Sequence, residues 1–205
     1  MGDVVYKSES RIERIKGPFR KAYIPATADP VDFGVHGSIA QHYGVTGTDE
    51  VATTLDYIVA ATGGWLAGTL GGALEARGIL ADASRLETTV EGEVEKEDGV
   101  LVLRRIHVNY RLKGSVDSEE IAVRVHSIHR DKCPVYKSIS DCIEITTELI
   151  FEAEWSELRS GWFLEYLKEG DDKVGLKRDT HGFGRICVLG GGNLGQALVR
   201  GWVEC

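Results

Sequence analysis

Cys133 stands directly before Pro134, and proline is common at the first position of a helix. A side chain at that point lies beside unpaired backbone N–H groups and the positive end of the helix dipole. Both features favour a thiolate, so Cys133 is a candidate reactive thiol. The alternative is a buried structural cysteine, because free cysteine is among the residues most often buried.

A second candidate consists of His126, His129 and Cys133, which would share one face of a continuous helix. Imidazole and thiolate ligands suit zinc. No fourth ligand stands at a useful spacing, and the alternative is a solvated helix end beside a cysteine. We therefore expect no metal at these residues.

A glycine-rich segment follows the short apolar run of residues 185–190, and it reads Gly190-Gly191-Gly192-Asn193-Leu194-Gly195. A strand that enters a glycine turn is the context of a dinucleotide-binding fingerprint. That unit needs about 30 residues and an acidic residue about 20 positions further on. Only ten residues follow Gly195. The fingerprint is incomplete, and we expect no cofactor.

The longest predicted element is a helix that begins at Thr53 or Thr54 and ends near Arg77, with Gly78 as the stop. Apolar residues occupy nearly every side of it, which predicts a buried helix. These residues are Leu55, Ile58, Val59, Trp65, Leu66, Leu70 and Leu74.

Gly64, Gly68 and Gly72 are spaced four apart in this helix, so they would let another helix or strand approach closely. That neighbour could come from a second subunit. The alternative is a membrane-spanning helix. Asp56 and five glycines lie inside the segment, and amphipathic strands flank it, so we favour a core helix.

Alternating polar and apolar residues predict strands around this helix. They are expected within residues 4–24, where Gly17-Pro18 marks a turn, and at 143–151. They are also expected at 88–95 and 100–112, which would form a hairpin with its turn at Glu97-Asp98-Gly99. Helices are expected at 37–43, 117–132 and 134–141, and the second of these would place Ile121, Val125, Ile128 and Cys133 on one face. The order predicts an α+β fold with a mostly antiparallel sheet against two main helices.

The 205 residues carry a net charge of −8 with 42% hydrophobic residues, which is typical of a soluble globular protein. This charge argues against nucleic acid and anionic membranes as partners. No basic segment followed by an apolar stretch opens the chain, so we expect a cytoplasmic protein. The four cysteines, at 133, 142, 187 and 205, do not form a disulfide scaffold.

Residues 53–151 resemble the OsmC/Ohr family of thiol-dependent hydroperoxide reductases. The resemblance is carried by residues 54–57 (TLDY), by 63–70 (GGWLAGTL) and by Cys133-Pro134-Val135. Residues 33–37 (FGVHG) look like a selenoprotein branch of the same family. The resemblance implies an intertwined homodimer whose sheets wrap around two central helices, with active sites at the subunit interface.

In that family one cysteine on the first central helix attacks the peroxide, and a second cysteine before a proline resolves the sulfenic acid. Cys133 falls on the second position, whereas Trp65 occupies the first. The family's carboxylate falls on Leu55, one residue from Asp56, and Arg20 is the nearest candidate for its arginine. We therefore expect no two-cysteine turnover. Cys142 is a possible partner of Cys133, but an intact helix would separate them by about 13 Å, too far for a disulfide.

The C-terminal part offers a second resemblance, because residues 185–201 look like the first strand and glycine turn of pyrroline carboxylate reductase. We therefore expect an OsmC-like domain at residues 1–153 and a poorly ordered extension at 154–205. One hypothesis explains both the tryptophan at the peroxidatic position and the C-terminal extension. Codon 65, read here as Trp65, would be a UGA that naturally encodes selenocysteine, and codon 155, read as Trp155, would be a UGA stop codon. The alternative is a non-catalytic paralogue with a genuine extension.

The leading functional hypothesis is a hydroperoxide-detoxifying protein of oxidative-stress defence that is inactive as written. Its expected partners are a second copy of itself, an organic hydroperoxide and a thiol reductant. The alternative is a dimer that binds a small apolar ligand beside Trp65, because indole can form an aromatic wall. Zinc binding through His126, His129 and Cys133 is a third hypothesis.

Overall fold

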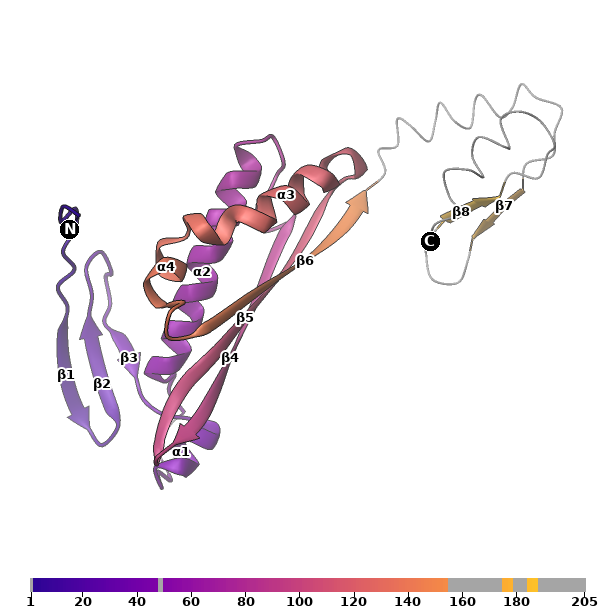
Figure 1. Cartoon of the computed structure of the whole chain (residues 1–205). Coiled ribbons are helices and arrows are strands. Elements are labelled where there is room, and N and C mark those ends of the chain that lie inside the picture. Colours follow the sequence, from indigo (N-terminus) through magenta and orange to yellow (C-terminus); the bar gives the residue numbers. More distant parts are fainter. Residues whose placement is uncertain (1, 48–49, 155–174, 179–183, 188–205) are drawn as a thin grey trace. The chain divides into compact units, whose positions relative to one another are not determined.

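The computed structural model describes residues 2–47, 50–154, 175–178 and 184–187 (Figure 1). The chain divides into two compact units, Met1–Glu154 and Trp155–Cys205. In the second unit β7 (Gly175–Arg178) pairs antiparallel with β8 (Gly184–Cys187). The glycine segment 190–195, Trp155 and Cys205 lie outside the described residues.

The main sheet of the first unit contains β4 (Leu86–Glu97), β5 (Val100–Ser115) and β6 (Glu144–Glu154), in that order. Asp98 and Gly99 both have positive φ and close the predicted hairpin between β4 and β5. β6 pairs with β5 in parallel. The sheet is therefore mixed, because the helices between β5 and β6 carry the chain back to the starting edge.

From Ile106 to Gly114 every second residue of β5 is buried, so this part of the strand forms one side of the core. Its fully buried side chains are Ile106, Val108, Tyr110 and Leu112. The opposite face carries charge pairs across the strands, among them Arg105 with Glu93 and Glu95. One face of the sheet is thus available for helices and the other meets water.

Helix α2 (Thr54–Glu75) lies along the apolar face of this sheet (Figure 1). Thr53 and Asp56 form a capping box at its start, and Gly78, with φ +76°, ends the turn after it, as predicted. Leu66, Leu70 and Leu74 are fully buried. Gly63 lies so close to β4 that an added Cβ would be 2.8 Å from the Cβ of Val90.

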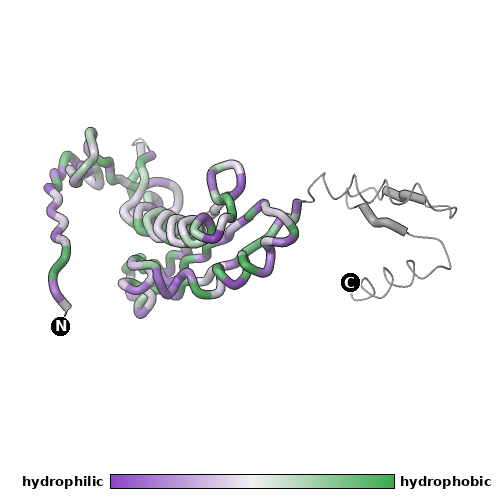
Figure 2. The backbone as a smooth tube through the Cα atoms, turned by 90° about the horizontal axis from the view of Figure 1, so that it is seen from above, coloured by the Kyte–Doolittle hydropathy of each residue, from purple (hydrophilic) through white to green (hydrophobic). Residues whose placement is uncertain are grey.

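The other side of α2 is exposed, which corrects the expectation of a wholly buried helix. Figure 2 shows α2 above the sheet, its middle turns coloured from white to green. One stripe of exposed residues runs along this side, and we call it the α2 stripe: Tyr57, Ile58, Ala61, Gly64, Trp65, Gly68 and Gly72. Charged residues are absent from it.

By length and composition α2 is also the one helix among the described residues that could cross a membrane. The core helix of a water-soluble protein passes the same test. The leucines of α2 pack on the apolar face of the sheet, but only 28% of its apolar stretch is buried within one chain, so α2 is a half-covered helix.

A second sheet, formed by β1 (Arg11–Lys16), β2 (Phe19–Tyr23) and β3 (Val31–Phe33), precedes α2. The turn falls at Gly17, as predicted, but residues 4–10 form no strand. This sheet is connected to the start of α2 by the Phe33 and Tyr57 rings, whose centroids lie 4.9 Å apart. A short helix, α1 (Gly37–His42), follows β3.

Helices α3 (Glu119–His129) and α4 (Pro134–Ile139) connect β5 to β6, with a 3-10 turn at Arg130–Lys132 between them. The buried residues of α3 are Ala122, Val125 and His129. The predicted face was partly wrong, because Ile121 and Ile128 are 43% and 47% exposed.

Candidate functional site

Cys133 caps the first turn of α4, where its Sγ accepts the backbone N–H of Tyr136 at 3.4 Å. Pro134 occupies the first helical turn, as predicted. The Cys133 side chain is fully buried, in the same apolar cluster as Leu66 and Tyr110. The cysteine therefore has the cap position expected of a reactive thiol and the burial expected of a structural one.

Trp65 lies on the α2 stripe and is 54% exposed. Together with Gly64, Gly68 and Thr69 it lines a shallow hollow of about 360 Å³. The next residue, Leu66, points into the cluster that contains Cys133, and α2 packs against α4. Within one chain, Trp65 thus lies at the surface and Cys133 in the core on neighbouring helices.

Asp56 is engaged in the cap of α2. Its Oδ2 accepts the Thr53 N–H at 2.6 Å and the Thr53 hydroxyl at 2.8 Å, and it lies 2.8 Å from Nε2 of His36. Burial opposes ionisation of the carboxyl, but the hydrogen bonds from Thr53 and His36 outweigh it and lower the pKa of Asp56. Leu55, where the family carboxylate falls, packs against the core.

Arg20 lies on β2, opposite Arg14 of β1 and Phe33 of β3. Its Nε is buried and has no hydrogen-bond partner among the described residues. The guanidinium therefore retains a buried N–H donor that a further group could satisfy.

A buried polar cluster beside Cys133 contains one residue that the sequence did not single out, Tyr110 of β5. Its hydroxyl lies 3.0 Å from Nε2 of His129. Burial raises the pKa of the Tyr110 phenol, and the charge of a Cys133 thiolate adds to this effect. Burial also lowers the pKa of both His126 and His129, so both rings are neutral near pH 7.

His126 and His129 stack with ring centroids 5.2 Å apart. Within the described ranges, no group of three His, Cys, Asp or Glu side chains could hold a metal ion. His126 and His129 therefore lie together on one face of α3, as predicted. Both ring nitrogens of His129 are already engaged, one with the Tyr110 hydroxyl and the other with the His126 carbonyl.

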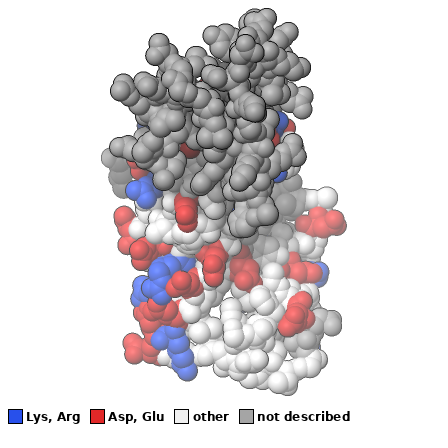
Figure 3. Space-filling model, turned by 90° about the vertical axis from the view of Figure 1, so that its right-hand side faces the viewer, with Lys and Arg blue, Asp and Glu red and all other residues white. Residues whose placement is uncertain are grey.

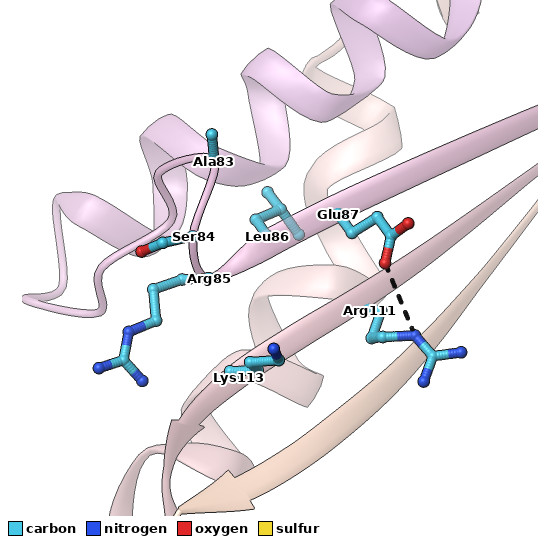
Figure 4. Close-up of a pocket in the computed structure, with 7 residues that line it drawn as sticks. All are labelled: Ala83, Ser84, Arg85, Leu86, Glu87, Arg111 and Lys113. Atoms are coloured by element: carbon cyan, nitrogen blue, oxygen red, sulfur yellow. Dashed lines mark ion pairs between the residues drawn. The ribbon is translucent and has the colours of Figure 1, made fainter.

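A second hollow, of about 400 Å³, lies at the end of the sheet where the chain enters β4 (Figure 4). Arg85, Arg111 and Lys113 line it, but Arg85 pairs with Glu154 and Arg111 with Glu152. In the described part of Figure 3, basic and acidic side chains lie next to one another along the left edge of the view, and acidic side chains also lie further to the right. Paired charges of this kind are typical of a solvated sheet face.

Cys142 is exposed and lies beyond the end of α4, whereas Cys133 is buried at its beginning. Cys187 belongs to β8 of the second unit. Among the described cysteines, Cys133 is the one in the core of the first unit.

Residues 47–148 match the protein family described as OsmC-like protein. Solved structures share the fold. An OsmC-like protein from Mycoplasma pneumoniae has 13% identity and a TM-score of 0.57, over 72% of this chain and 99% of that chain. An organic hydroperoxide resistance protein from Legionella pneumophila has 9% identity and a TM-score of 0.55, over 72% and 98%.

An OsmC-like protein of unknown function from Vibrio cholerae has 10% identity and a TM-score of 0.58, over 71% of this chain and 100% of that chain. No curated protein matches this sequence. At these identities the likeness shows the fold, which is OsmC-like.

Proposed function

We propose that this chain, whose residues 47–148 match the OsmC-like protein family, has the scaffold of a thiol-dependent hydroperoxide reductase. Trp65 would occupy the position of the peroxidatic residue, and Cys133 would be the resolving thiol. The observation that carries the proposal is the placement of both positions within the matched segment, on helices that pack together. The Legionella pneumophila protein of the same fold is named for hydroperoxide resistance.

The proposed reaction needs a thiolate or selenolate at position 65. That nucleophile attacks the O–O bond of an organic hydroperoxide, so that the bond breaks, a sulfenic or selenenic acid forms and an alcohol leaves. The Cys133 thiol then displaces water and forms a disulfide or selenosulfide, which an external dithiol reduces by exchange. Two electrons pass from the dithiol to the peroxide.

The chain as written lacks this nucleophile, because the indole of Trp65 cannot be a thiolate. Asp56, one residue after the position of the family's carboxylate, is engaged with Thr53 and His36 at the start of α2. We therefore propose that the chain is inactive in peroxide turnover but retains the resolving thiol, Cys133. The reducing cytoplasm is the compartment we propose, because Cys133 must return to the thiol.

A homodimer is part of this proposal. Apart from Tyr57, whose ring contacts Phe33, the α2 stripe is an apolar surface left exposed by the described residues. The first sheet and the segment before it expose further large apolar side chains. Val5, Tyr6, Ile12 and Ile15 are each at least half exposed. A second copy would cover these surfaces, and Trp65 would then lie at the interface.

The hypothesis that Trp65 replaces a natural selenocysteine is tested on the coding sequence. UGA at codon 65 would support recoding, and UGA at codon 155 would mark the natural end of the domain. UGG at both positions would contradict the hypothesis and leave a paralogue with a genuine extension.

The catalytic proposal is tested with the variant Trp65→Cys. Purified protein is mixed with an organic hydroperoxide and a dithiol, and peroxide loss is followed. We expect turnover by Trp65→Cys and none by the wild type. Trp65→Ser should also be inactive, and it is the matched control because serine is similar in size to cysteine but has no thiol. Adding Cys133→Ser to the active variant should preserve one peroxide equivalent per site and abolish disulfide formation. An inert but folded Trp65→Cys would refute the proposal.

A second candidate function is the binding of a small apolar ligand, which the hollow beside Trp65 favours. A thermal-shift series with saturated fatty acids, which cannot be reduced, tests it. Stabilisation that is lost in Trp65→Ser would support binding, and the absence of any shift would contradict it.

A further inference from the structure

A connecting segment lies between β5 and β6, and few buried side chains attach it to the core. It spans residues 116–143 and contains α3, the turn Arg130–Lys132 and α4. Its buried side chains are Ala122, Val125, His129 and Cys133. Spacings of three and four residues place them in one row along the helical run. One of the four is a histidine, so the attachment of this segment depends partly on an imidazole.

The hydrogen bonds of His129 require a neutral ring. Nδ1 lies 2.6 Å from the carbonyl oxygen of His126, which can only accept, so Nδ1 carries the hydrogen. Nε2 then has the lone pair and accepts the Tyr110 hydroxyl at 3.0 Å. A proton on Nε2 would remove this acceptor. Protonation of His129 therefore ends the donation from Tyr110, which joins the connecting segment to β5.

His126 is the second ring of the pair. It stacks on His129 with ring centroids 5.2 Å apart and an angle of 27° between the ring planes. Its Nε2 is buried and has no hydrogen-bond partner among the described residues. A buried polar atom without a partner is unfavourable, and a charge on either ring would lie within one ring spacing of the other. Both facts favour exposure of the pair to water once a proton binds.

Among the described residues, few charges near the pair could compensate a bound proton. Arg130 opposes a proton on both rings, whereas Asp131 favours one on His129. On β5 the facing group is Tyr110, whose phenol is neutral because burial raises its pKa. Cys133 lies at the start of α4, and the core residues that α2, β4 and β6 contribute are apolar. A protonated ring would thus be buried with little compensation, which is unfavourable.

We propose that His126 and His129 form an acid-sensitive latch, in which uptake of a proton releases the connecting segment from the core while β4, β5 and β6 stay paired. The opening is local because β4 and β6 are paired with β5 along their whole length, whereas only four side chains of the segment are buried. The released rings are hydrated, and Cys133 leaves the core with them. The inference goes beyond the proposed function, since it needs no nucleophile at position 65.

The direction of the effect follows from the protons that the open and closed forms bind. In the open segment both rings are in water and have the ordinary histidine pKa of 6.5, whereas burial lowers the pKa of both in the closed fold. Between these values the open form binds more protons, so its population rises as the pH falls below 6.5. The rise levels off below the closed-form pKa values. Each proton taken up changes the population by at most about tenfold per pH unit.

Hydrogen exchange of the full chain, followed by mass spectrometry between about pH 7.5 and 5.5, tests the latch. Labelling times are scaled to the intrinsic exchange rate at each pH. We expect the protection of the α3 amides to fall by about tenfold over this range and that of the β5 amides to change little. Unchanged protection in α3 would overturn the latch. Equal losses in α3 and β5 would also overturn it, because the opening would then be global.

Matched variants assign the effect to the two rings. The double variant His126→Phe with His129→Gln cannot take up a proton, but it keeps an aromatic ring and an acceptor for the Tyr110 hydroxyl, so α3 protection should not depend on pH. Val125→Ala weakens the attachment without changing a titratable group and should lower protection by one factor at every pH. His42→Gln, in α1, should behave as the wild type. A pH dependence that survives in the double variant, or is lost in His42→Gln, would refute the latch. If the double variant does not fold, His126→Phe replaces it and must weaken the dependence.

The latch and the proposed function are tested separately. Exchange is measured on the chain with Trp65, which has no peroxidatic nucleophile, so an inert Trp65→Cys variant would refute the function and leave the latch intact. Conversely, α3 protection that does not change with pH would refute the latch, while peroxide turnover by Trp65→Cys would still support the function.

Discussion

The imidazole Nε2 of His36 lies 2.8 Å from Oδ2 of Asp56, the same oxygen that caps α2 through Thr53. One carboxylate oxygen therefore receives donors from the segment after β3 and from the residue before α2. Phe33 and Tyr57 add a ring contact at the same junction. The first sheet is thus connected to the start of the helix that bears Trp65.

The capping box predicts a measurable loss of stability in Thr53→Ala. The substitution removes the hydroxyl that accepts the Asp56 N–H and donates to its carboxylate. Removing such a cap destabilises a protein by about 1 kcal/mol. Urea unfolding at pH 7 measures the change, with Thr54→Ala, an exposed neighbour inside the helix, as the control. Equal midpoints for the two variants would contradict the role of the cap.

The carboxylate of Asp56 predicts a pH dependence in the acid range. Its pKa is lower in the folded chain than its ordinary value of 3.8, so the unfolded chain binds the proton more tightly. The stabilisation is therefore complete above that value and is lost as the pH falls through the folded pKa. We expect the difference in urea midpoint between wild type and Asp56→Asn to shrink below about pH 4. A difference that stays constant down to pH 2.5 would refute this.

The buried histidines predict a second pH dependence at higher pH. Burial lowers the pKa of His126 and His129 below 6.5 in the folded chain, so between the folded and ordinary values the unfolded chain binds more protons. The free energy of unfolding should fall as the pH drops below 6.5, by at most about 1.4 kcal/mol per pH unit for each ring. It should level off below the folded pKa values.

The melting temperature between pH 7.5 and 5 measures this effect. His126→Phe retains an aromatic ring for the stack on His129 and should reduce the decline, whereas His42→Gln, in the short helix α1, should leave it unchanged. A decline of equal size in His126→Phe would assign the effect to other groups.

Local signals allowed the boundaries of elements to be predicted from the sequence. Thr53 and Gly78 marked the ends of α2, and Asp98-Gly99 marked the hairpin, because caps and turns depend on neighbouring residues. The parallel direction of β6 was not predictable from its own residues, since alternation gives a strand's faces but not its direction. Ile121 and Ile128 look like core residues by spacing, yet they lie outside the buried face of α3.

The candidate site was predicted only in part, because local sequence signals are visible and contacts between distant residues are not. Cys133 was visible because Pro134 follows it, and Trp65 because of the family resemblance. Tyr110 was missed because its partner His129 is 19 residues away on another element. The one available signal was alternation along the strand, which placed Tyr110 on the inward face of β5.

The exposed side of α2 leads to the last prediction, which concerns association. Periodicity predicted a helix buried on all sides, but a single chain covers only one side of it, so a second copy is the expected cover for the α2 stripe. Gly68 lies at the centre of the stripe, and a Cβ built there meets no atom within 4 Å. The variant Gly68→Leu therefore introduces no clash within the chain, but it would hold a partner helix away from α2.

Sedimentation velocity at micromolar concentration should show a dimer for the wild type and a monomer for Gly68→Leu. Thr89→Leu places the same side chain on the exposed outer face of β4 and should remain dimeric. Circular dichroism controls for folding in both variants. A wild type that sediments as a monomer, or a Gly68→Leu variant that stays dimeric, would contradict the α2 stripe as the interface.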